Sequence, residues 1–212
     1  AGGIAHDFNN LLTAILGNVS LARLRMQPAD RSIELLTEAE QATERARHLT
    51  QQLLTFSRGG APVREVTELS TLIRDTASFA TRGSKSRCEF ELPADLWRAR
   101  IDAGQIGQVF MNLLDNAIKY LSPRRKGSIR IRGRTEGEKS IYSVEDNGIG
   151  IAAEHQSKVF EIFHRLGPTE YTKGEGIGLT AAKRILARQN GRIWLQSEPD
   201  KGTTFYVELP RA

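Results

Sequence analysis

The chain contains little cysteine and no long apolar segment. The first shortage excludes internal disulfides, and the second argues against a membrane-spanning helix. Cys88 is its only cysteine, so no disulfide can form within the chain, and a reducing compartment such as the cytoplasm is the expected location. No apolar run approaches the roughly 20 residues of a membrane-spanning helix, and the sequence does not open on a charged segment followed by an apolar one. We therefore expect no membrane contact from these residues, although a longer parent protein could be anchored upstream of them.

A local excess of charge of one sign is lacking as well. The formal net charge is +5, but lysines and arginines are scattered among polar positions, which favours solvated surfaces over a nucleic-acid interface. His48, His155 and His164 have no metal-ligand spacing with cysteine or with each other, so we expect them at the surface or in a lid. A length of 212 residues permits one large domain or two small ones.

Two amphipathic helices are predicted at the start of the chain. Apolar residues recur at spacings of three and four over residues 4–26 and again over 33–56, and Pro28 interrupts the pattern between them. So short a connection makes the two helices antiparallel neighbours. A lone hairpin cannot cover its apolar stripe, so we expect a homodimer in which two hairpins form a four-helix bundle.

Gly59-Gly60-Ala61-Pro62 breaks the helical pattern and separates two regions of different texture. We predict a helical domain over 1–58, a linker over 59–66 and a second domain over 67–212. In the second domain, separate helical and alternating segments are typical of an α+β fold, with an α/β sandwich. The helices are expected over residues 69–79, 103–120 and 176–189, and the strands over 88–92, 97–101, 128–134, 140–144, 193–196 and 205–209.

Reactive side chains gather in the run His6-Asp7-Phe8-Asn9-Asn10-Leu11-Leu12. His6 and Asn10 are four residues apart and share a helical face. A neutral imidazole can attack phosphorus, and a carboxylate such as Asp7 can fix its tautomer and stabilise the developing charge. Asn10 cannot transfer protons, but it can orient a water for hydrolysis of a partner's phospho-aspartate. An isolated histidine would more often only decorate a helix; the motifs further along the chain favour the reactive interpretation.

Asn112 and Asn116 are also four residues apart, on the helix predicted over 103–120. Amide oxygens on one face can hold a magnesium ion that carries waters and phosphate oxygens, and Lys119 on the adjacent strip can meet a phosphate. The alternative is a polar stripe on an amphipathic helix. Asparagine has a poor helix propensity, so two of them in a strong helix indicate a function.

Two glycine motifs follow. Asp146 comes after a predicted strand and opens Asp-x-Gly-x-Gly, where a buried carboxylate could accept a hydrogen bond from the exocyclic amine of adenine. Gly148 and Gly150 would let the backbone approach the ring. Gly174-x-Gly-x-Gly-Leu then opens a helix whose N-terminus can bind phosphates. The pattern is neither a Walker loop nor a Rossmann fingerprint.

The polar segment between the two glycine motifs fits an ATP lid better than a compact turn. Near the end of the chain, the hydroxyl of Thr203 or of Thr204 could assist Asp146 at the adenine.

In their order, these blocks resemble the H, N, G1, F, G2 and G3 boxes of sensor histidine kinases, and the resemblance covers nearly the whole chain. It implies a dimerisation and histidine-phosphotransfer domain followed by a Bergerat-fold ATP-binding domain, that is, an ATP- and Mg²⁺-dependent protein histidine kinase of a two-component system. It also implies that His6 is the phosphoacceptor, Asp7 its acid/base partner and Asn10 the phosphatase residue. The phosphoryl group would pass to an aspartate of a response-regulator receiver domain.

The same resemblance assigns the nucleotide site. Asn116 would coordinate magnesium, with Asn112 and Lys119 near the phosphates and Asp146 reading adenine. The positions carried over as ATP-binding are Asn112, Asn116, Lys119, Tyr120, Asp146, Gly148, Gly150, Phe163, Arg165, Gly174, Gly176, Gly178, Leu179, Thr203 and Thr204. The chain departs from the common H box, which has a proline shortly after the histidine. Its lid looks more like that of phytochrome-type kinases than like the usual lid of kinases with His-Asp-Phe-Asn-Asn.

Two other functions stay open at this point. One is a signalling scaffold that binds ATP without transferring phosphate, although His6, Asp7 and Asp146 are all present. The other is an ATPase of the gyrase, chaperone and mismatch-repair kind, which needs a catalytic carboxylate on the helix that carries the asparagines. Asp115 is the one acidic residue inside that box. The signal, the cognate regulator, phosphorylation within or between protomers, and the dominance of kinase or phosphatase activity are not encoded in these motifs.

Overall fold

The computed structural model describes residues 2–26, 32–40, 42–43, 62–82, 84, 86–96, 98–162 and 176–212, with side chains from residue 11 onward. The chain divides into two compact units, Ala1–Gly60 and Ala61–Ala212. Among the described helices, none combines the length and the apolar character needed to cross a membrane.

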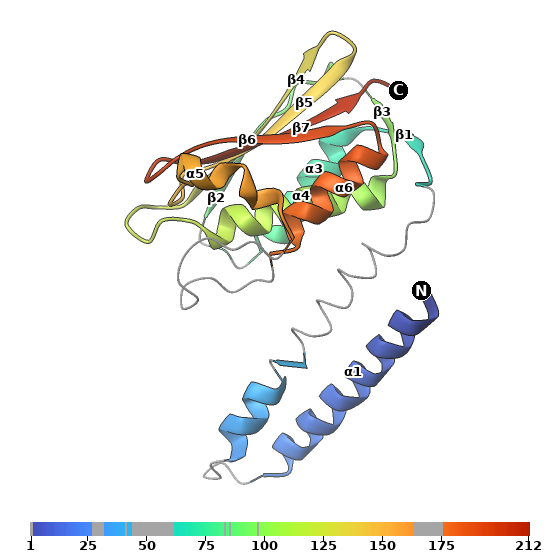
Figure 1. The fold of residues 1–212 in the computed structure, drawn as a ribbon, viewed down its shortest axis with the longest axis vertical. Helices are drawn as coiled ribbons and strands as arrows, with labels where there is room; N and C mark the ends of the chain where they lie inside the picture. Colours follow the sequence, from blue (N-terminus) through green and yellow to red (C-terminus); the bar gives the residue numbers. More distant parts are fainter. Residues whose placement is uncertain are drawn as a thin grey trace. The chain divides into compact units, whose positions relative to one another are not determined.

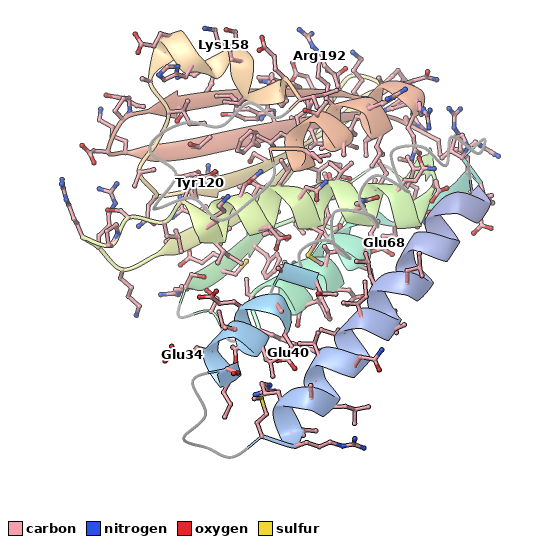
Figure 2. The ribbon with its side chains drawn as sticks, turned by 60° about the horizontal axis from the view of Figure 1, so that its bottom comes forward. Glu34, Glu40, Glu68, Tyr120, Lys158 and Arg192 are labelled. Carbon is pink, nitrogen blue, oxygen red and sulfur yellow. The ribbon has the colours of Figure 1, made fainter. Side chains whose placement is uncertain are left out.

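The first unit is helical. It contains α1 (Gly2–Leu24) and a second helical stretch over residues 32–40 and 42–43. Glu40, labelled in Figure 2, joins the two: its carboxylate accepts a hydrogen bond from Ser20 Oγ at 2.5 Å and lies 3.0 Å from Arg23 Nε. The Ser20 hydrogen bond, with Arg23, holds the pKa of Glu40 below its usual value. This polar contact links the two helical segments.

Four large apolar side chains of α1 are exposed in the single chain. They are Leu11, Ile15, Leu21 and Leu24. Exposed side chains of this kind leave apolar area in water unless another surface covers it.

The second unit is built on a five-stranded mixed sheet with the strand order β2-β4-β5-β7-β6. Its strands are β2 (Arg87–Glu91), β4 (Ser128–Glu136), β5 (Lys139–Asp146), β6 (Arg192–Glu198) and β7 (Gly202–Pro210). Strand β2 runs parallel to β4, and the other pairs are antiparallel. Figure 1 shows the helices α3 (Leu69–Ala80), α4 (Ala103–Lys119) and α6 (Gly178–Arg188) on one face of this sheet.

Helix α4 lies at the centre of the core. Its buried residues recur at spacings of three and four: Ile106, Val109, Phe110, Leu113, Leu114 and Ala117. Phe110 meets Tyr142 of β5 edge to face, with ring centroids 6.0 Å apart. Side chains in the middle of β5 are buried on both faces. The core therefore fixes where the ends of α4 and β5 lie.

The architecture confirms the predicted fold class, a helical region followed by an α/β sandwich. The sequence did not predict β1 (Glu65–Thr67), which overlaps the expected linker and pairs antiparallel with β3 (Ala99–Ile101). Two further short elements, α5 (Ala153–Gln156) and η1 (Lys158–Phe160), were not predicted either. Segments of three or four residues are too short to show a periodicity.

Within the second unit, residues 62–67 make hydrogen bonds where α4 begins and α6 ends. Asp102 caps α4 by accepting from Gln105 N through Oδ1, and its Oδ2 accepts from Val63 N at 3.2 Å. Arg64 Nη2 donates to the carbonyl oxygen of Arg188, the last residue of α6. One carboxylate thus serves both the helix start and the incoming chain.

Replacement of this carboxylate should weaken the second unit. We expect Asp102→Ala to lower its free energy of unfolding by about 1–2 kcal/mol, because a helix cap and the bond to Val63 are both lost. Denaturant unfolding followed by the fluorescence of the two tryptophans, Trp97 and Trp194, measures the change. The exposed Asp95→Ala serves as the control. Equal unfolding curves for the two variants would contradict the role given to Asp102.

Candidate nucleotide-binding site

The carboxylate of Asp146 ends β5 and is only 6% exposed. Its Oδ1 accepts hydrogen bonds from Gly148 N at 2.8 Å and from Thr203 N at 3.3 Å. Burial raises the pKa of Asp146 to about 6, against the lowering effect of these two amides; Glu145 raises it further and Arg125 lowers it. Both amides use the same oxygen, so Oδ2 is left to accept from a ligand.

The loop after Asp146 needs glycine at two positions. A Cβ on Gly148 would collide with the carbonyl oxygen of Tyr120. Gly150 has φ +71°, and a Cβ there would collide with the carbonyl oxygen of Glu198. The Asp-x-Gly-x-Gly pattern therefore reflects close backbone packing around Asp146.

Helix α4 supplies a second side to the site. Tyr120, labelled at the end of α4 in Figure 2, accepts from Ile149 N through its carbonyl oxygen at 2.9 Å, which ties the helix end to the glycine loop. Lys119 Nζ lies 4.8 Å from the centre of the Tyr120 ring, and Asn116 is half-buried. The predicted site residues at the end of this helix thus adjoin the loop that follows Asp146.

Asn112 connects α4 to the start of α6. Its Nδ2 donates to the carbonyl oxygen of Gly178 at 3.0 Å, which leaves Oδ1 as the acceptor of this amide. Gly178 and Leu179 open α6, and Gly176 before them has φ +71°. In the first turn, Thr180 Oγ1 donates to Phe160 O at 3.0 Å. The amides at this N-terminus form the kind of end that binds anions.

The two threonines predicted near Asp146 have different places. Thr203 pairs with Asp146 across β5 and β7 and reaches its carboxylate through the backbone amide, while its hydroxyl is paired with Ser197 Oγ at 2.8 Å. Thr204 pairs with Glu145, so it lies on the opposite face of the sheet. The structure therefore brings Thr203, through its backbone, to Asp146.

Other predicted site residues lie outside what the structure describes. Phe163, Arg165, Gly174 and the expected lid fall in the range 163–175. His6, Asp7 and Asn10 lie in α1, and their side chains precede the described ones.

Sequence reasoning missed residues that hold the loop rather than face a ligand. Asn147 Oδ1 accepts from Ser128 N at 2.9 Å and Nδ2 donates to Lys126 O at 2.9 Å. Ser197 Oγ accepts from Ile151 N at 2.8 Å on the other side of the loop. The Asp-Asn-Gly sequence was a visible signal for Asn147, whereas nothing local marked Ser197.

A buried carboxylate beside a glycine loop, next to an asparagine helix and a second glycine-led helix, defines a nucleotide-binding domain of the Bergerat class. Family comparison agrees: residues 101–212 match "Histidine kinase-, DNA gyrase B-, and HSP90-like ATPase", and residues 1–62 match "His Kinase A (phospho-acceptor) domain". The chain belongs to the histidine kinases and comprises their catalytic core.

Individual relatives are consistent with this assignment. The chain is 35% identical to the sensor kinase CckA of Brucella abortus (strain 2308), with 100% of this chain and 24% of that protein aligned. It is 34% identical to the histidine-protein kinase AtoS of Escherichia coli (strain K12), with 98% and 34% aligned. The chain thus spans about a quarter to a third of these two relatives.

Solved structures show the same fold. Full-length ShkA in complex with AMPPNP matches 99% of this chain and 45% of its own, with a TM-score of 0.80 and 22% identity. Histidine kinase ThkA in complex with response regulator TrrA matches 99% and 60%, with a TM-score of 0.70 and 21% identity.

The raised pKa of Asp146 has a consequence for stability. The carboxyl is harder to ionise in the folded chain, so its contribution to stability is present at low pH and lost as the pH rises from 3.8 to about 6. The difference corresponds to about 3 kcal/mol. We expect Asp146→Asn to be more stable than the native chain at pH 8, by up to about this amount, and equally stable near pH 4.

The same variant should also bind nucleotide more weakly. An amide has one acceptor oxygen, and the backbone amides of Gly148 and Thr203 already donate to that oxygen. Chemical unfolding at both pH values and ADP titration test the two effects, with the exposed Asp95→Asn as control. A less stable Asp146→Asn at pH 8 would contradict the burial cost assigned to this carboxylate.

Proposed function

We propose that this chain is the ATP-dependent protein histidine kinase core of a two-component system, which phosphorylates His6 and passes the phosphoryl group to a response-regulator aspartate. The observation that carries the proposal is the buried, loop-enclosed Asp146 in a chain whose first 62 residues match a phospho-acceptor domain. Hydrolysis of the regulator's phospho-aspartate, by a water that Asn10 orients, belongs to the same proposal.

In the nucleotide site, Asp146 accepts from the exocyclic amine of adenine while Gly148 and Gly150 let the backbone lie against the ring. Lys119 and the first amides of α6 hold the phosphates. The remaining ATP contacts assigned by motif, Phe163, Arg165 and Gly174, belong to the proposed lid segment, which lies outside the described residues.

Magnesium fits the donor set at the end of α4. A magnesium ion commonly keeps waters and phosphate oxygens in its shell, so it needs few protein ligands. Asn116 and Asn112 supply amide oxygens for it, and the Asn112 bond to Gly178 uses only the amide nitrogen. Bound there, the ion would neutralise charge on the β- and γ-phosphates.

At the acceptor, Asp7 holds one ring nitrogen of His6 and keeps the other neutral and nucleophilic. The γ-phosphorus bonds to that nitrogen as its bond to the ADP oxygen breaks. Catalysis is then mostly positioning and electrostatic stabilisation. Asn10, one helical turn away, orients the water that hydrolyses the regulator's phospho-aspartate.

The partners follow from the first unit. The exposed apolar side chains of α1 are covered when two chains form a homodimer through their helical hairpins. A receiver domain of a response regulator docks against the resulting bundle. The solved complex of histidine kinase ThkA with response regulator TrrA is an example of such a pair of partners. A reducing cytoplasm suits the single cysteine.

The direct test is incubation with γ-labelled ATP and magnesium. We expect label that is acid-labile and base-stable in the native chain and in His48→Ala, and none in His6→Ala, because only His6 accepts the phosphoryl group. Gel autoradiography after acid and base treatment measures it. Nucleotide binding without label would favour the scaffold, and ATP hydrolysis without label would favour a gyrase- or chaperone-like ATPase.

The homodimer has its own test. Ile15→Asp should convert the dimer to a monomer, because a charge replaces an apolar side chain that is exposed in the single chain and buried between two. Light scattering gives the mass, and the exposed Asn18→Asp is the matched control. A dimeric Ile15→Asp chain would exclude this stripe as the interface.

A further inference from the structure

Arg125 lies in the loop that connects α4 to β4 and reaches across to two other segments. Its Nε donates to the carbonyl oxygen of Asn147 at 2.7 Å, and its Nη2 donates to the carbonyl oxygen of Gly148, also at 2.7 Å. The same Nη2 contacts the carbonyl oxygen of Asp200, in the turn between β6 and β7. A single guanidinium therefore joins three loops.

These loops are the surroundings of Asp146. Asn147 and Gly148 directly follow it, and the amide of Gly148 is one of the two donors to Oδ1. The turn around Asp200 leads into Thr203, whose amide is the other donor, and Asp200 N also bonds to Ile149 O at 2.8 Å. Arg125 thus bonds to both of the segments that carry the donors to the carboxylate.

The chemistry of the contact favours arginine. Three carbonyl oxygens that point to one place repel each other unless a cation or several donors lie between them. A planar guanidinium supplies several donors in a fixed fork, whereas a lysine ammonium supplies one compact point. The loop it holds contains Gly148 and Gly150 and has little conformational restriction of its own. Holding such a loop in its binding geometry before the ligand arrives strengthens binding.

We propose that Arg125 is a positioning residue of the nucleotide site, which fixes the loop after Asp146 against the turn around Asp200 so that the carboxylate is presented to adenine. The inference rests on the proposed binding of ATP by this unit. Arg125 acts through Asp146 and does not itself touch the nucleotide.

Charge provides a second route from Arg125 to the ligand. Among the described residues, the charged groups that act on Asp146 are Glu145, which raises its pKa, and Arg125, which lowers it. Removal of the guanidinium charge should therefore keep Asp146 protonated to a higher pH, whereas a lysine should leave the titration nearly unchanged. Geometry and charge can thus be separated by two substitutions.

The experiment compares Arg125→Met, Arg125→Lys and Arg124→Met in the full chain. Arg124 is the adjacent exposed arginine, and its described hydrogen bond is made by its backbone amide to Ser122, so it is the matched control. Calorimetric titration with ADP and magnesium from pH 5 to 8 gives the Kd and the pH at which binding is half lost. Autophosphorylation at saturating ATP gives kcat.

For Arg125→Met we expect the Kd for ADP to rise about tenfold, the pH midpoint to move upward, and kcat at saturating ATP to stay unchanged. Arg125→Lys should show a smaller rise in Kd with the native pH midpoint, and Arg124→Met should match the native chain. A higher Kd for ADP without a change in kcat is what a positioning role predicts.

Several results would overturn the proposal. One is an unchanged Kd in Arg125→Met. Another is a lowered melting temperature with no change in pH midpoint, which would indicate a purely structural residue. Absence of ADP binding in the native chain overturns it together with the proposed function. ADP binding without acid-labile phosphate would overturn the kinase assignment alone, and the Kd comparison would still decide the role of Arg125.

Discussion

The burial of one carboxylate at the end of the central strand is the constraint on which the second unit depends. The ionised form of Asp146 is destabilised at this position. Burial opposes ionisation more strongly than the two amides and a nearby arginine favour it. The surrounding fold keeps it there: β5 is covered on both faces, and β7 presents Thr203 opposite it. A binding site whose main acceptor is costly to ionise is stabilised when a ligand satisfies that acceptor.

Long periodic segments and motifs with a chemical reason were predictable from the sequence. Helix α4 and strand β5 have strong apolar patterns, so their existence, type and approximate bounds followed directly, and with them the places of Asn112, Asn116 and Asp146. The glycines were recognisable as a motif, and the structure adds a physical reason for two of them, because a Cβ at Gly148 or Gly150 would collide with a carbonyl oxygen of another segment. Each of these signals is local, and each reports a physical requirement at its own position.

Contacts between distant segments were not predictable in the same way. Thr203 and Thr204 have similar side chains, and only the register of β7 against β5 decides which one faces Asp146. Arg125 stands in a polar loop where an arginine is ordinary, and its role depends on two carbonyl groups about twenty residues further on and a third in another hairpin. β1 is three residues long and forms only because β3 offers an edge to it.

The hydrogen bonds made by residues 62–67 also have a mechanical consequence. Helices α4 and α6 each have one end at these hydrogen bonds, at Asp102 and Arg188. Further along, towards the proposed nucleotide site, the two helices are joined by the hydrogen bond between Asn112 and Gly178. α4 alone extends about 25 Å. A force on this segment would therefore reach both helices at the ends that lie away from the proposed nucleotide site.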